Sequence, residues 1–134
     1  MLDAICLIAT DEPAVRAYLR AILHVERFQS LEASSAAQAL RILQKLDGRL
    51  DLLLSDLRLP GDMNGLDLAW SVHSQFPAVP VILLAGYDRE EALGRIREFE
   101  VIQKPFVPET IQAAARQALR SRHVKATHGG APWG

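Results

Sequence analysis

The sequence predicts an α/β fold: a five-stranded parallel sheet, doubly wound, with helices on both of its faces. Two observations predict it. Short apolar runs alternate with amphipathic helical patterns five times along 134 residues, with short connections between them. One run, Leu52-Leu53-Leu54, is apolar on consecutive positions, which is typical of a strand buried on both faces in a parallel sheet. The length fits one domain, which we expect over residues 1–120.

The first half of the chain contains two strands and two helices. The apolar run 4–9 predicts the first strand, and Pro13 is well suited to open the helix that follows. Weak alternation over 28–33 predicts the second strand. Ser34 or Ser35 can then cap a second helix.

The second half repeats the pattern three times. The third strand, 50–55, runs into Asp56 and the Pro60-Gly61 turn, and a helix follows Asn64-Gly65 with Leu66, Ala69, Trp70 and Val72 near one face. A fourth strand is expected over 79–84 and a fifth over 100–103. One of the two remaining helices is expected to begin at Asp88, since Asp88 and Glu91 resemble a capping box, and the last is expected to begin at Pro108. A flexible C-terminal tail is expected over 121–134.

Charged residues follow three of the predicted strands. Asp11 and Glu12 follow the first strand, Asp56 follows the third and Lys104 follows the fifth. Because the carboxyl ends of parallel strands share one edge, where open α/β sheets bind ligands, these side chains should converge. Clustered carboxylates repel one another, and a hard cation such as Mg²⁺ relieves that repulsion. A carboxylate nucleophile with a metal ion and a lysine suits phosphoryl transfer.

Composition excludes several other classes of protein. The net charge of −1 argues against bulk-charge binding to nucleic acid, and no apolar run is long enough for a membrane span. Cys6 is the sole cysteine, so no disulfide can form within the chain, and no signal peptide is evident. A cytoplasmic protein is expected, and Met1 together with the trailing tail favours a complete chain.

Over roughly residues 4–119 the chain resembles the receiver domain of two-component response regulators. The matching segments are Asp11-Glu12-Pro13, Asp56 with Leu59-Pro60-Gly61 and Asn64-Gly65, Pro80-Val81-Ile82-Leu83-Leu84, and Lys104-Pro105-Phe106. The resemblance implies a flavodoxin-like sheet in the order 2-1-3-4-5 and a cis Lys104-Pro105 bond. It also implies that a histidine kinase or phosphotransfer protein phosphorylates Asp56. Mg²⁺ would be held by Asp11, Asp56 and the carbonyl of Arg58, and Lys104 would hold the phosphoryl group.

Three positions depart from the pattern of that family. Thr10 stands where the first of two acids is usual, so the affinity for Mg²⁺ should fall. Ala85 replaces a serine or threonine that binds the phosphoryl group, and Val101 replaces the aromatic switch residue. Both residues that usually couple phosphorylation to the output response in this family are therefore missing, and we expect other residues to transmit the signal.

Two main functions are left open. The first is a single-domain response regulator, not an enzyme beyond its own phosphorylation and dephosphorylation, that signals to an unknown downstream protein. The second is a pseudo-receiver that binds proteins independently of phosphorylation. A metal-dependent phosphatase is disfavoured, because Arg58 occupies the position of the second acid that such an enzyme would need. No direct contact with nucleic acid or membrane is expected. By analogy, a homodimer could form through the fourth helix, fifth strand and fifth helix.

Overall fold

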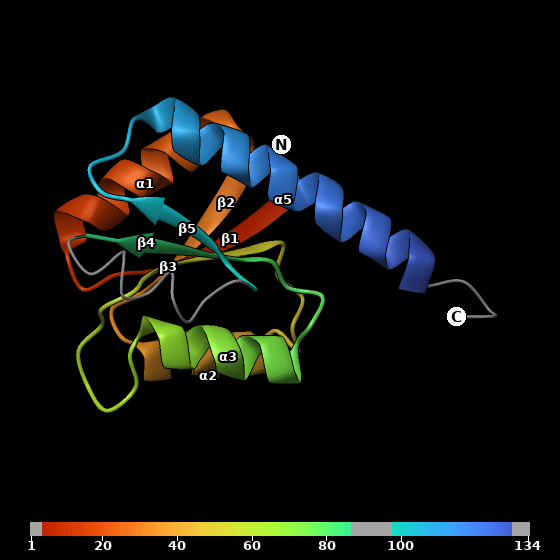
Figure 1. The fold of residues 1–134 in the computed structure, drawn as a ribbon, viewed down its shortest axis with the longest axis horizontal. Coiled ribbons are helices and arrows are strands. Elements are labelled where there is room, and N and C mark those ends of the chain that lie inside the picture. Colours follow the sequence, from red (N-terminus) through yellow and green to blue (C-terminus); the bar gives the residue numbers. More distant parts are fainter. Residues whose placement is uncertain (1–3, 87–97, 130–134) are drawn as a thin grey trace.

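The sheet has the predicted order. The computed structural model describes residues 4–86 and 98–129, with side chains described through residue 120. Five parallel strands lie in the order β2-β1-β3-β4-β5, which confirms the doubly wound, flavodoxin-like topology (Figure 1). They are β1 (Ala4–Ala9), β2 (Phe28–Ala33), β3 (Leu52–Asp56), β4 (Val81–Ala85) and β5 (Glu100–Gln103).

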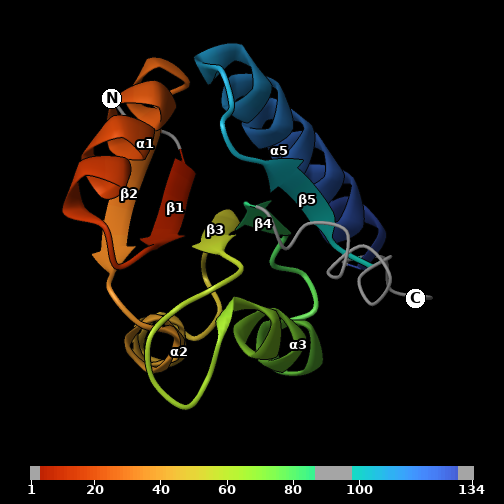
Figure 2. The same ribbon diagram turned by 60° about the vertical axis from the view of Figure 1, so that its left-hand side comes forward.

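Helices cover both faces of this sheet. On one face α1 (Pro13–Val25) lies beside α5 (Pro108–Gly129), and on the other face α2 (Ala36–Lys45) lies beside α3 (Gly65–Gln75) (Figure 2). Each helix pair therefore closes a separate core against the sheet. In the part of the chain that the structure describes, no helix is long and apolar enough to cross a bilayer.

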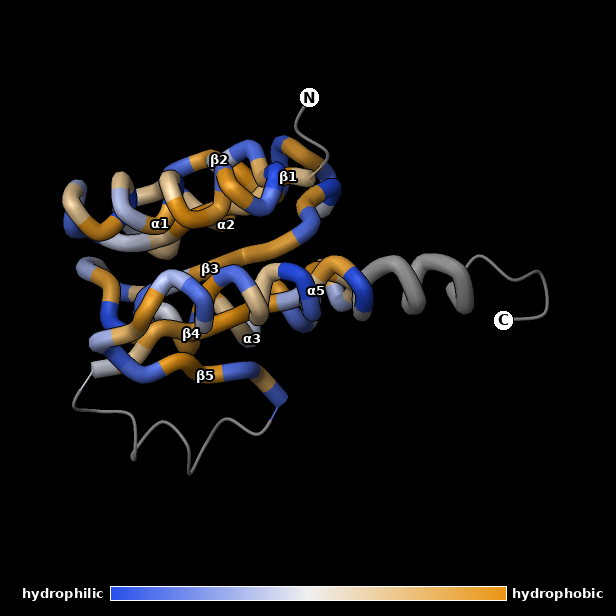
Figure 3. The backbone as a smooth tube through the Cα atoms, turned by 90° about the horizontal axis from the view of Figure 1, so that it is seen from above, coloured by the Kyte–Doolittle hydropathy of each residue, from blue (hydrophilic) through white to orange (hydrophobic). Residues whose placement is uncertain are grey.

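The central strands are buried on both faces, as their continuous apolar runs predict. Every residue of β3 and β4 is buried. Side chains alternate across the sheet, so Leu52 and Leu54 enter the core under α1 and α5, whereas Leu53 enters the core under α2 and α3. Figure 3 shows this apolar character along β3 and β4. Strand β3 thus carries Asp56 on a rigid support.

Two helix starts are set by side-chain caps. The Ser35 hydroxyl accepts a hydrogen bond from the Gln38 backbone N–H at 3.1 Å, so Ser35, of the two serines considered, is the cap of α2. At α3, Asn64 and Asp67 form a reciprocal capping box, with distances of 2.8 and 3.1 Å. This second cap pins the end of the loop that follows Asp56.

The structure differs from the sequence-based expectation in two helices. Helix α5 continues to Gly129, because residues 121–128 contain no proline or glycine that would end it; the flexibility expected for 121–134 stays a prediction. In α3, the buried positions are Gly65, Leu68, Ala69 and Val72, while Trp70 is 39% exposed and lies edge-on to Phe99. The helix expected from Asp88 lies outside the described residues.

Cys6 gives a direct test of this packing. It lies in the core on β1 with 0% exposure, and burial raises the pKa of its thiol well above the ordinary value, with a smaller contribution from the charge of Asp51. Because the thiolate is the reactive species, we expect the native protein to resist a thiol reagent at neutral pH while the denatured chain reacts fully. Intact-mass measurement of both samples checks this, and rapid modification of the native protein would contradict the buried position.

Candidate functional site

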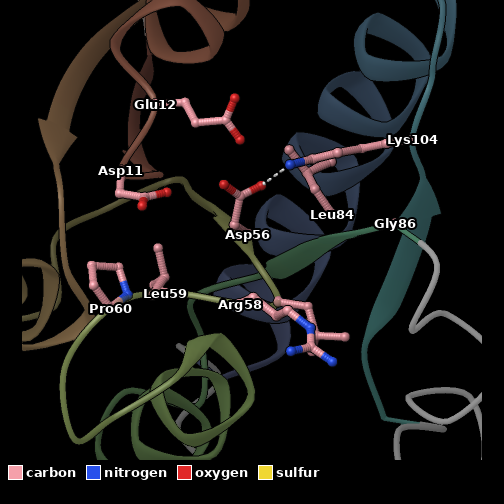
Figure 4. A pocket seen from close by; sticks show the side chains of 10 residues that line it. Asp11, Glu12, Asp56, Arg58, Leu59, Pro60, Leu84, Gly86 and Lys104 are labelled. Atoms are coloured by element: carbon pink, nitrogen blue, oxygen red, sulfur yellow. Dashed lines mark ion pairs between the residues drawn. The ribbon is translucent and has the colours of Figure 1, made fainter.

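Three strand ends build one pocket, as the sequence predicts. Asp56 is the last residue of β3, Asp11 and Glu12 connect β1 to α1, and Lys104 directly follows β5. Their side chains face a common space at the carboxyl edge of the sheet (Figure 4). The cavity measures about 570 Å³. The other residues that line it are Leu57, Arg58, Leu59, Pro60, Leu84 and Gly86.

Asp56 and Lys104 form an ion pair inside the pocket. The Lys104 Nζ lies 2.7 Å from Asp56 Oδ1, and Asp56 is only 3% exposed. The backbone N–H of Lys104 donates to the Ala85 carbonyl at 2.8 Å, which ties the base of the lysine to the end of β4. The Lys104-Pro105 bond is cis, as the resemblance implies. The ammonium is thus held where it can meet an anionic group carried by Asp56.

The backbone around Asp56 is fixed on several sides. The Ser55 hydroxyl donates to the Asp56 carbonyl at 2.9 Å, and the Leu57 N–H donates to the Leu84 carbonyl at 2.8 Å. The Gly65 N–H closes the loop by donating to the Leu57 carbonyl at 2.9 Å. A Cβ on Gly65 would lie 1.8 Å from the Asp56 carbonyl oxygen, so the start of α3 approaches the site this closely only because residue 65 is glycine. The sequence interpretation treated Asn64-Gly65 as a helix start and missed this contact.

Three carboxylates in the pocket suit a hard divalent cation. Oxygens of Asp11, Glu12 and Asp56 lie within 4.8 Å of one another. Carboxylate oxygens are the ligands that Mg²⁺ prefers, and Mg²⁺ commonly keeps several waters and takes one or two protein carboxylates. Together with the Lys104 ammonium, the three carboxylates carry a net charge of −2. The donor set therefore fits Mg²⁺ in chemistry and in charge.

The atypical positions lie around the pocket rather than in it. Thr10 is 0% exposed, and its hydroxyl accepts from the Glu12 N–H at 3.3 Å. Ala85 is buried at the end of β4, and Val101 pairs with Leu83 on β5, half-buried. Thr10, Ala85 and Val101 are thus not among the residues that line the cavity. Arg58 does line the cavity, but its guanidinium is directed away from the carboxylates (Figure 4).

Comparisons with known proteins agree on one family. The family model "Response regulator receiver domain" matches residues 6–116. The chain is 34% identical over 126 residues to the KDP operon transcriptional regulatory protein KdpE of Escherichia coli (strain K12), covering 90% of this chain and 53% of that protein. It is 27% identical over 122 residues to the sporulation initiation phosphotransferase F of Bacillus subtilis (strain 168), covering 89% of this chain and 96% of that protein.

Solved structures give the same result. A receiver domain protein from Clostridium thermocellum superposes with a TM-score of 0.84 at 25% identity, covering 91% of this chain and 98% of that one. The receiver domain of NtrX from Brucella abortus superposes with a TM-score of 0.77 at 29% identity, covering 86% and 98%. Several relatives are much longer: the chain spans 26% of the hydrogenase transcriptional regulatory protein HoxA of Cupriavidus necator, at 31% identity over 92% of this chain.

Proposed function

The chain belongs to the response regulator receiver family, and on that premise we propose that Asp56 accepts a phosphoryl group from a histidine kinase or phosphotransfer protein in the presence of Mg²⁺. One observation carries the proposal. Asp56 is a nearly buried carboxylate, paired with Lys104 at 2.7 Å, in a pocket that also holds Asp11 and Glu12. An aspartate that served only to end a strand or cap a turn would not require a paired lysine and two further carboxylates beside it.

The transfer moves one phosphoryl group and one proton. A carboxylate oxygen of Asp56 attacks phosphorus in line, and the P–N bond to the donor histidine breaks. The electron pair of that bond stays on the imidazole nitrogen, which takes up a proton from solvent. Lys104 then moves from the free carboxylate to an oxygen of the phosphoryl group, where its positive charge offsets the added negative charge.

Each charged residue has a distinct role in this proposal. Asp56 is the nucleophile, and Lys104 holds the phosphoryl oxygen. Asp11, Asp56 and the backbone carbonyl of Arg58 are the proposed Mg²⁺ ligands. Mg²⁺, when bound, neutralises charge on the transferring group. The buried β3 strand and the capped start of α3 keep these groups in place, so little reorganisation is needed during transfer.

Partners and output are proposed on the same basis. Curated relatives include the sensor kinase CckA of Brucella abortus and the phosphotransferase from Bacillus subtilis, which supports a histidine kinase or phosphotransfer protein as the donor. We take residues 1–120 as the receiver unit of a cytoplasmic, single-domain regulator that signals through protein contacts, with no direct contact to nucleic acid or membrane. A homodimer through the fourth helix, β5 and α5 is part of this proposal; the fourth helix falls outside the described residues.

A phosphorylation-independent pseudo-receiver is the alternative, and specific residues favour it. Ala85 ends β4 beside the pocket without a hydroxyl that could bind a phosphoryl oxygen. Val101 on β5 is a small aliphatic residue that offers no aromatic ring to swing between two positions. If this alternative holds, the protein binds its partner equally well with and without a phosphoryl group.

Incubation with acetyl phosphate and Mg²⁺ tests the proposal. We expect intact-mass spectrometry to show one added phosphoryl group per chain, because the nucleophile and the lysine are both in place. Omission of Mg²⁺ and addition of a chelator should suppress the modification. A receiver that is readily labelled under the same conditions serves as the positive control. Absence of any added group, while that control is labelled, would contradict the proposal.

A further inference from the structure

We propose that Glu12 is a carboxylate of the Mg²⁺ site, and that it supplies the negative charge that Thr10 cannot bring. This inference takes one element from the proposed function, namely that Mg²⁺ is the cation that binds in the pocket. It concerns a residue of this chain that the motif of the family does not assign to the metal. Without it, Asp11 and Asp56 would be the only carboxylates of the described residues in the pocket.

The side chain of Glu12 is not used by the helix that it precedes. Glu12 is the N-cap residue of α1, with φ −97° and ψ 110°, yet its side chain makes no capping hydrogen bond. Acidic side chains next to a helix start commonly accept from the first free N–H groups. Here the carboxylate instead faces the pocket, with an oxygen within 4.8 Å of an Asp56 oxygen, and Lys104 lines the same pocket (Figure 4).

Thr10 holds the loop so that Glu12 takes this position. The Thr10 N–H donates to the Ala33 carbonyl at 3.0 Å, and the Thr10 carbonyl accepts from Arg16 Nη1 at 2.7 Å. Its hydroxyl accepts from the Glu12 N–H at 3.3 Å. Arg16 is itself held by Glu32 at 3.1 Å. Thr10 is therefore a buried anchor of the loop, while Asp11 and Glu12 are the exposed acids at its tip.

The charge balance gives Glu12 a measurable role. With Glu12, the three carboxylates and the Lys104 ammonium carry a net charge of −2, which matches one divalent cation. Without the Glu12 carboxylate, the net charge of the remaining three groups is only −1. The oxygens of the three carboxylates lie within 4.8 Å of one another, so removing one of these negative charges would reduce the attraction for a divalent cation even in a solvated site, and we expect about tenfold weaker binding.

Direct binding measurements on the intact protein without a phosphodonor test the inference. Mn²⁺ serves as the probe, because it shares the preference of Mg²⁺ for six oxygen ligands and free Mn²⁺ is counted by electron paramagnetic resonance. We expect one site in the wild type, displaced by Mg²⁺. Glu12→Gln, which keeps the shape and removes the charge, should raise the dissociation constant for Mn²⁺ about tenfold.

Glu100→Gln is the matched control. Glu100 is exposed and is the first residue of β5, whereas the pocket lies at the carboxyl ends of the strands, so this variant loses the same charge away from the site. Its dissociation constant should stay within about twofold of the wild-type value, since solvent and salt screen a distant charge. Circular dichroism melts establish that each variant is folded.

Each outcome either supports or overturns the inference. A loss confined to Glu12→Gln supports it. Equal affinities for the wild type and Glu12→Gln overturn it, and so does a wild type that binds no Mn²⁺. Because no phosphodonor is present, these results are separate from those for the proposed function. A wild type that binds Mn²⁺ through Glu12 but is never phosphorylated would contradict the proposed function alone.

Discussion

Replacing Asp56 by asparagine is expected to abolish phosphorylation by acetyl phosphate in the presence of Mg²⁺. The asparagine amide occupies the same volume but has no anionic oxygen to attack phosphorus. The fold should tolerate the change. The substitution removes one of three crowded carboxylates, and the Lys104 side chain, which is 30% exposed, can turn to solvent or to the remaining acids. Intact-mass spectrometry should therefore show an unmodified chain under conditions that label the wild type.

Asp62→Asn is the control for this experiment. Asp62 is exposed in the loop between β3 and α3, outside the residues that line the pocket, and the same substitution there should leave labelling at the wild-type level. Labelling of Asp56→Asn at that level would instead place the acceptor on another residue. Partner binding that is identical for wild type, phosphorylated wild type and Asp56→Asn would favour the pseudo-receiver alternative.

Replacing Gly65 by alanine is expected to destabilise the protein by about 3 kcal/mol, at the upper end of the cost of overpacking. The new Cβ would lie 1.8 Å from the Asp56 carbonyl oxygen and 2.8 Å from the Leu57 carbonyl oxygen. Both are backbone atoms, so a side-chain rotation cannot relieve the clash. Either α3 or the end of β3 has to move, and each movement displaces Asp56. Urea denaturation measures the loss in the free energy of unfolding, and phosphorylation of the folded variant should be slower.

Gly86→Ala provides the comparison. Gly86 also lines the pocket, but a Cβ built on it meets nothing within 4 Å. The free energy of unfolding should then change by no more than about 0.5 kcal/mol, as for surface substitutions that leave special contacts intact. If Gly65→Ala proved as stable as Gly86→Ala, the close approach of α3 to the end of β3 would be wrong.

Much of the fold could be predicted because parallel sheets leave strong local signals. A strand buried on both faces must be apolar at consecutive positions, which is why Leu52, Leu53 and Leu54 are recognisable as a central strand. The site followed from the fold. Once Asp11, Asp56 and Lys104 are known to follow parallel strands, their convergence is a consequence of the shared strand direction, and the structure places all three around one pocket.

Helix faces and helix ends were less predictable. Trp70 is apolar and lies in an apolar stretch, yet the buried positions of α3 follow the spacing 65, 68, 69 and 72, which leaves Trp70 on the flank beside Phe99. Only the position of the sheet decides which side of a helix is covered. The end of α5 was hard to predict for a related reason, since a mostly polar segment without a helix breaker is compatible with either a helix or a tail.

Three features could be predicted from the amino-acid sequence alone: the α/β class, the alternation of strands and helices, and the identity of the charged groups at the strand ends. Each of these depends on residue type and local spacing, which the chain carries directly. Two other features are visible only in the folded molecule: Thr10 is buried as a loop anchor while Glu12 faces the pocket, and residue 65 must be glycine. Those features depend on contacts between segments far apart in the chain, such as Thr10 with Ala33, and on the direction in which a side chain leaves the backbone.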